Sequence, residues 1–73
     1  MLPSLGDAVA PDSLRELFHR LNNQLGVILA NAELIEARAA DDLTRARAAQ
    51  VVESAVQAMA AVRELRARIE PDA

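Results

Sequence analysis

The 73-residue sequence contains no cysteine, only one aromatic residue, Phe18, and only two glycines. Without cysteine, neither a disulfide nor a thiolate metal site can stabilise the fold. A β-sandwich or barrel needs many aromatic and β-branched residues, so the shortage of aromatics argues against both. A chain this short also buries little surface when it folds alone. We therefore expect a small helical protein that gains stability by oligomerising.

Lysine is also absent, so the eight basic residues are all arginines, and they face eleven acidic residues. The net charge of −3 disfavours nucleic-acid binding, which normally needs a basic surface. No segment resembles a secretory signal, and no apolar run is long enough to cross a membrane. A single histidine without cysteine predicts no metal site, and no motif indicates a cofactor. We expect a cytoplasmic protein that binds neither nucleic acid nor membrane.

Two long helices account for most of the sequence. Ser13, followed three residues later by Glu16, is a capping-box signal, which predicts that the first helix begins at Ser13. The sequence AADD at residues 39–42 predicts a turn, in which either aspartate can cap the second helix, and Pro71 ends that helix. The predicted organisation is a flexible arm over residues 1–12, a helical domain over residues 13–70 and a tail over residues 71–73.

Apolar residues in both helices recur at alternating spacings of four and three, the heptad pattern of helices in a bundle. Other apolar side chains widen both stripes beyond what one interface can cover, and the short turn forces the helices to run antiparallel. The predicted fold is therefore all-α, an antiparallel two-helix hairpin that dimerises into a four-helix bundle. The predicted seam comprises Leu14, Phe18, Leu21, Leu25, Ile28, Ala32, Ile35 and Ala39 in the first helix, and Val51, Ala55, Ala58, Val62, Leu65 and Ile69 in the second.

The segment after Phe18 departs from an ordinary bundle helix. His19 lies beside the predicted seam, and Asn23 lies one turn further along on the same side. Asn and Gly are poor helix formers, so the pair Asn22 and Asn23 followed by Gly26 indicates a role other than stability. The plainer interpretation is a solvated polar patch, with Gly26 admitting a neighbouring helix. The order of the residues favours a functional interpretation.

The sequence FHRLNNQL, residues 18–25, resembles the phosphoacceptor box of sensor histidine kinases. In that family the histidine is followed by Leu two residues on, by Asn or Thr four on and by Leu six on. The resemblance extends over about residues 14–69 and covers the family's dimerisation and histidine-phosphotransfer domain, itself a helical hairpin dimer. The places of the motif are filled here by His19, Leu21, Asn23 and Leu25.

The resemblance implies that His19 is phosphorylated at Nε2 and that Asn23 lies beside the phosphoryl group, where it can orient a water for dephosphorylation. Arg20 stands where many of these kinases carry an acid that orients the histidine, although a related subfamily carries His-Arg. Glu16, one turn earlier, can take the role of that acid. Because this sequence contains neither an ATP-binding domain nor a nucleotide motif, the phosphoryl group must come from another protein.

Several arginines are predicted to surround His19. In an antiparallel hairpin that turns near Ala40, His19 lies at about the height of Val62. Arginines of both helices then give His19 a cationic setting that suits a phosphoryl group or an acidic partner. The predicted phosphoryl- or partner-binding residues are Arg15, Arg20, Asn22, Arg63 and Arg66.

Three functions are left open. The first is a phosphotransfer module of two-component signalling, in which His19 exchanges a phosphoryl group with a partner kinase or receiver domain. The second is a binding module without chemistry that regulates a histidine kinase or response regulator, and Arg20 in place of the acid keeps it open. The third is a fragment or degenerate remnant of a full histidine kinase, against which Met1 and the early capping signal argue. In none of them is this chain a kinase by itself.

Overall fold

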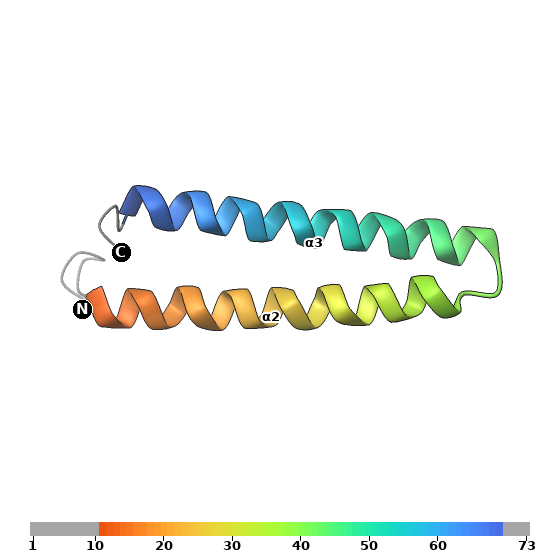
Figure 1. Cartoon of the computed structure of the whole chain (residues 1–73), viewed down its shortest axis with the longest axis horizontal. Helices are drawn as coiled ribbons and strands as arrows, with labels where there is room; N and C mark the ends of the chain where they lie inside the picture. The colour runs from red at the N-terminus through yellow and green to blue at the C-terminus, as the bar shows by residue number, and fades with distance from the viewer. Residues whose placement is uncertain (1–10, 70–73) are drawn as a thin grey trace, which may run out of the picture.

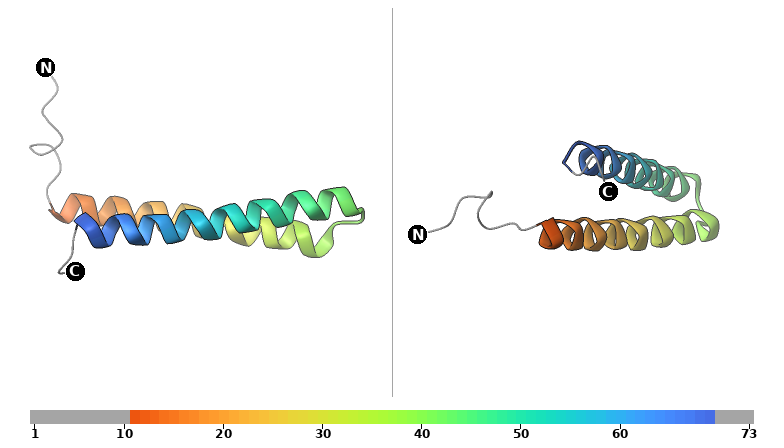
Figure 2. Two further views of the ribbon diagram at one scale, coloured as in Figure 1. Left: turned by 90° about the horizontal axis from the view of Figure 1, so that it is seen from above. Right: turned by 60° about the vertical axis from the view of Figure 1, so that its left-hand side comes forward.

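The computed structural model describes residues 11–69, which form an all-α hairpin. Helix α2 spans Pro11–Arg38 and helix α3 spans Asp42–Ile69. The helices run antiparallel and side by side along their whole length, so that Pro11 and Ile69 lie at the end opposite the turn (Figure 1). Seen from above, they cross at a shallow angle (Figure 2). The predicted all-α antiparallel hairpin is confirmed.

Helix α2 begins two residues earlier than predicted, at Pro11. Proline suits the first turn of a helix because its fixed φ is helical and its missing N–H has no intrahelical partner there. Ser13 therefore lies inside the helix, and the predicted capping box with Glu16 is not the start of α2. Residues 1–10 of the predicted arm and the predicted tail lie outside the described residues.

The turn is held by Asp41, which caps α3 as predicted. Its Oδ2 accepts a hydrogen bond from the Thr44 backbone N–H at 3.0 Å, which satisfies an open donor of the first turn. Hydrogen bonds from the side chain and backbone of Thr44 lower the pKa of the Asp41 carboxyl, because they stabilise its charged form. The Arg45 guanidinium reaches back to donate to the Ala39 carbonyl at 3.0 Å and contacts the Asp42 carboxylate at 3.3 Å.

The seam between α2 and α3 is built largely from small side chains. Alanines dominate it, and they allow the two helices to approach closely. Half-buried residues complete the seam. Asn22 in α2 and Met59 and Arg66 in α3 each lie four positions after a buried residue, and Leu29 lies three positions before the buried Ala32. The buried residues of the described chain are Phe18, Ala32, Ala48, Ala55 and Val62.

Part of the predicted seam does not lie between the two helices. Six residues assigned to it are 44–53% exposed, because each apolar stripe is wide enough for two interfaces and the helices face each other along only one edge of it. Ile69 is exposed at the end of α3. The other five form a continuous surface, which we call the apolar flank: Leu21, Ile28 and Ile35 in α2, and Val51 and Leu65 in α3.

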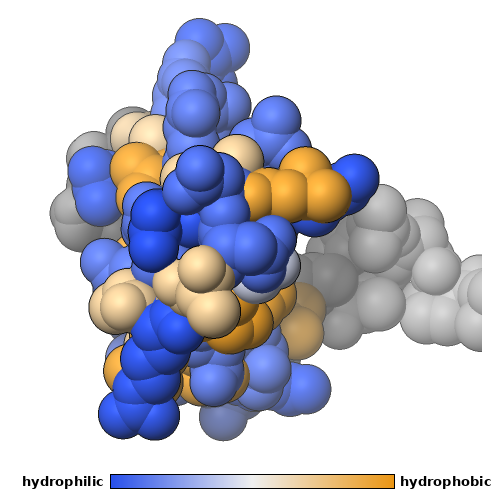
Figure 3. Space-filling model, turned by 90° about the vertical axis from the view of Figure 1, so that its right-hand side faces the viewer, coloured by the Kyte–Doolittle hydropathy of each residue, from blue (hydrophilic) through white to orange (hydrophobic). Residues whose placement is uncertain are grey.

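A shallow groove follows the apolar flank where α2 and α3 meet. It is lined by Val27, Ile28, Asn31, Ala32, Ile35, Ala48 and Val51. Asn31 is the one polar residue of this lining, and its side-chain amide donates to the Val27 carbonyl at 2.9 Å. Apolar side chains also reach the surface at the turn end, where Leu34 and Leu43 are exposed (Figure 3). The hairpin thus leaves a larger apolar surface open than scattered single residues would.

Candidate histidine site

His19 lies on the opposite side of the hairpin from the apolar flank. Successive residues of a helix are about 100° apart. His19 follows the buried Phe18, whereas Leu21 precedes the half-buried Asn22, so the two side chains leave the seam in opposite directions. His19 is exposed and Phe18 only 5% exposed, as predicted, but Leu21 is 45% exposed and not buried.

The surface around His19 draws residues from both helices. In two antiparallel helices that face each other, residues that directly follow a seam residue fall on the same side of the pair. Such residues are Gly26, which follows Leu25, and Val56, which follows Ala55. We call this surface the histidine flank and define it by His19, Gly26, Val56 and Arg63.

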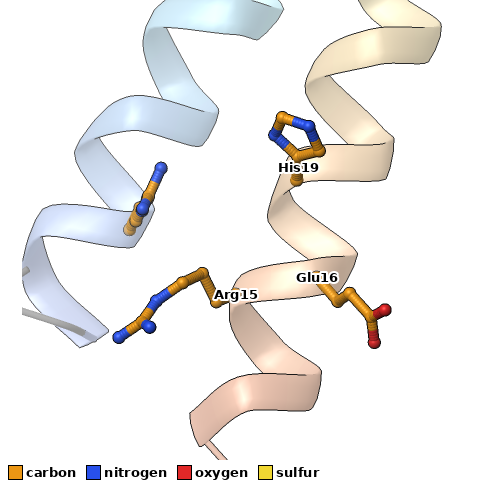
Figure 4. A pocket seen from close by; sticks show the side chains of 4 residues that line it. Arg15, Glu16 and His19 are labelled. Atoms are coloured by element: carbon orange, nitrogen blue, oxygen red, sulfur yellow. The ribbon is translucent and has the colours of Figure 1, made fainter.

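A shallow pocket at the open end of the hairpin is lined by Arg15, Glu16, His19 and Arg66. In Figure 4 the Arg15 side chain extends from α2 toward α3, while the His19 ring stands one turn above it beside the space between the helices. Arg66 lines the same pocket from α3 and is half-buried. Arg15 and Arg66, both predicted near His19, therefore reach it from different helices.

Glu16 is not placed to orient the imidazole. Its carboxylate points away from the His19 ring although both residues line the pocket (Figure 4). No hydrogen bond or ion pair joins Glu16 to His19 in the part of the chain that is described. The geometry therefore gives no support to the predicted role of Glu16.

The remaining predicted residues lie around the pocket without lining it. Asn23 is exposed four residues after His19, on a neighbouring part of the same helix surface. Arg20 is exposed next to His19, and Arg63 is exposed on the histidine flank. Asn22 is half-buried at the seam between α2 and α3 and is not part of the exposed surface around His19.

Two residues of the histidine flank have a significance that sequence reasoning missed. Val56 is one of the apolar residues that widen the stripe of the second helix, yet it is 50% exposed and lies on the other side of the seam from the apolar flank. At Gly26 an added Cβ would meet no side chain and no part of α3 within 4 Å, so this glycine does not admit the neighbouring helix. Both could have been placed on this flank from their positions in the sequence, because each directly follows a seam residue.

The described residues set limits on other chemistry. Within residues 11–69 there is no group of three or more His, Asp or Glu side chains that could hold a metal ion. Neither α2 nor α3 is long and apolar enough to span a membrane. The site offers an exposed imidazole, whose nitrogen lone pair is a nucleophile, in a pocket that is also lined by two arginines, whose guanidinium groups attract anions.

Comparison of the chain with protein-family models, with curated proteins and with solved structures finds no match.

Proposed function

We propose that this chain is a histidine phosphotransfer module of two-component signalling, in which His19 receives a phosphoryl group from a partner protein and passes it on. The observation that carries the proposal is the exposed His19 beside Arg15 and Arg66, contributed by two helices of one hairpin. This histidine stands in the sequence FHRLNNQL, which resembles the phosphoacceptor box of sensor histidine kinases.

The proposed reaction is nucleophilic attack by Nε2 of His19 on the phosphorus of an aspartyl phosphate in a receiver domain. The N–P bond forms as the P–O bond to the aspartate breaks, the bonding electron pair leaves with the carboxylate, and Nδ1 keeps its proton. Arg15 and Arg66 stabilise the negative charge on the phosphoryl oxygens during transfer. Asn23, one turn after His19, holds a water for later hydrolysis of the phosphohistidine.

The proposed functional unit is a dimer in which the apolar flanks of two hairpins pack together as a four-helix bundle. A single hairpin leaves eleven large apolar side chains exposed, more than a stable small domain tolerates. The apolar flank repeats at heptad spacing in both helices, and a surface of that kind packs best on another heptad surface of equal length. A second copy of this chain supplies such a surface and leaves the histidine flank facing outward.

The test is phosphate on His19 after the chain is mixed with phosphorylated receiver domains or kinases from its own genome. Phosphohistidine is lost in acid and survives alkali, so the wild type should carry acid-labile phosphate and His19→Ala should carry none. His19→Ala should unfold within about 0.5 kcal/mol of the wild type, because the residue is exposed. A wild type that takes up no phosphate from any of these partners contradicts the proposal.

A binding module without chemistry is the second candidate function. It is favoured by Glu16, which turns away from the ring, and by Arg20, which stands in place of the expected acid. Such a module would use the histidine flank to bind and regulate a kinase or receiver domain. Partner binding with equal affinity by the wild type and His19→Ala, without phosphate uptake by either, would identify this function.

A further inference from the structure

We infer that Gly26 and Val56 form a docking surface beside His19, on which an apolar side chain of the phosphoryl-exchanging partner packs. The inference rests on the proposed function and adds where the partner binds. The partner is a protein whose phosphorylated carboxylate faces Arg15 and Arg66, while an apolar residue next to that carboxylate lies against Gly26 and Val56.

Gly26 has no structural reason within the hairpin. A glycine inside a helix lowers stability, and it is normally retained for a positive φ or for close packing. No described residue has a positive φ, and α3 does not approach the position of the missing Cβ. Gly26 also lies in the middle of α2, so it does not cap the helix. What remains is the open space at the position of the missing Cβ, which we call the recess, where a partner can approach the backbone of α2.

Val56 gives this recess an apolar wall. The turn is centred near Ala40, and the seam residues Leu25 and Ala55 are each fifteen residues from it, so they lie at the same height. Ala32 and Ala48, which both line the groove of the apolar flank, are each eight residues from Ala40 and so fit the same register. Gly26 and Val56, which follow Leu25 and Ala55, therefore lie close to one level on the same side.

Val56 is exposed on the side that the proposed dimer does not cover. It is 50% exposed, and the other residues that define the histidine flank are a histidine, a glycine and an arginine. An exposed valine next to an open stretch of backbone offers an apolar side chain of a partner a surface to pack on. The extended apolar flank, in contrast, matches a second copy of the chain.

One domain of the partner can contact both the recess at Gly26 and the ring of His19. Gly26 lies seven residues after His19 on the same face of α2, which is roughly 10 Å along the helix. Arg15 and Arg66 beside His19, with Arg63 on the same flank, give this end of the surface a positive charge that complements an aspartyl phosphate. An apolar contact at one end and an anionic contact at the other fix the orientation of the partner.

Two phosphoryl donors separate docking from chemistry. Phosphoramidate is a small donor that needs no docking, whereas a receiver domain phosphorylated on aspartate must dock. Gly26→Leu fills the recess, and Ala37→Leu adds the same side chain at an exposed position of α2 that is roughly 27 Å from His19. Phosphoramidate should label His19 equally in both variants and the wild type. Transfer from the receiver should slow by at least about tenfold in Gly26→Leu and stay unchanged in Ala37→Leu.

Two further variants separate the effect of side-chain size in the docking surface from the effect of helix stability. Gly26→Ala should raise Tm by about 4–8 °C and retain most of the transfer, because a methyl group only partly fills the recess. Val56→Ala, which removes the apolar wall, should slow transfer from the receiver and leave labelling by phosphoramidate unchanged.

Two results would overturn the docking surface while leaving the proposed function intact. One is transfer from the receiver to Gly26→Leu at the wild-type rate. The other is a changed oligomeric state of Gly26→Leu in light scattering, which would place Gly26 between copies of the chain. If neither donor labels the wild type, the proposed function fails and the docking inference fails with it.

Discussion

The apolar flank and the histidine flank are built by the same two helices and face opposite ways. Ile28 on the first and Val56 on the second are almost equally exposed in one hairpin, at 47% and 50%. They differ in their surroundings, because Ile28 belongs to a heptad row that follows α2 whereas Val56 is the one exposed apolar residue that defines its flank. If the proposed dimer and docking surface exist, the extent of an apolar pattern separates a surface for a permanent partner from one for a transient partner, which exposure alone does not do.

The largest expected effect comes from placing the same charge on each flank. If two hairpins pair through the apolar flank, Ile28→Asp buries a charge without a partner and should unfold the protein, a cost beyond the ~3 kcal/mol of an ordinary substitution. Val56→Asp should change the free energy of unfolding by less than about 1 kcal/mol, because its side chain stays in water. Urea denaturation measures both variants.

The control for this comparison is the oligomeric state of the wild type. Light scattering at micromolar concentration should give the mass of two chains. A compact wild-type monomer, or equal effects of Ile28→Asp and Val56→Asp, would remove the difference between the flanks and contradict the dimer.

A smaller effect is expected from Asn31, the polar residue of the groove on the apolar flank. A buried polar residue in a helical bundle costs stability and favours one alignment of the helices. Asn31 is exposed in the single hairpin and becomes buried only in the proposed dimer, in which case Asn31→Leu should raise the free energy of unfolding by about 1 kcal/mol. It should also yield more than one oligomeric species in size-exclusion chromatography. Gln50→Leu, at an exposed position of α3, is the matched control and should do neither. Identical behaviour of the two variants would show that Asn31 stays in water.

The smallest effect on stability is expected at the turn. It belongs to neither flank, so the effects of substitutions on the flanks can be compared with it. The Asp41 pKa is lowered in the folded chain by the hydrogen bonds from Thr44, so the charged cap stabilises the fold above the unfolded-state pKa of about 3.9. That stability is lost as the pH falls through the lower pKa of the folded state. Asp41→Ala should lower Tm at pH 7, and its difference from the wild type should shrink below about pH 4. Asp41→Asn, which retains a capping oxygen, isolates the contribution of the charge. A difference that is independent of pH would show that the charge contributes nothing.

The fold was predictable because its signals are local. The heptad spacing predicted the two helices, and Asp41, which follows two alanines, predicted the turn and the cap. Which edge of each stripe faces the other helix was not predictable. Leu21 and Asn22 are adjacent, and a stripe wide enough for two interfaces does not indicate which of them points at α3. The small alanines at the seam set that rotation.

The candidate site was predictable only in part. The exposure of His19 follows from its phase relative to Phe18, and the closeness of Arg66 follows from the register of a short antiparallel hairpin. The direction of the Glu16 side chain depends on rotamers, about which spacing says nothing. The recess at Gly26 could not be predicted, because a glycine in a helix is equally compatible with a tightly packed neighbour.

The bonds of the turn also bear on the order in which the hairpin assembles. They connect residues no more than six positions apart, so they can form before any contact between distant parts of the chain. We therefore expect the helices to close progressively away from Ala40, so that the level of His19, near the open end, closes late. Local opening should follow the reverse order, with amide protection lost first at the end farthest from the turn, which hydrogen exchange measures. We expect the region of His19, near the open end, to open more readily than the turn and to adjust at little cost around a bound partner.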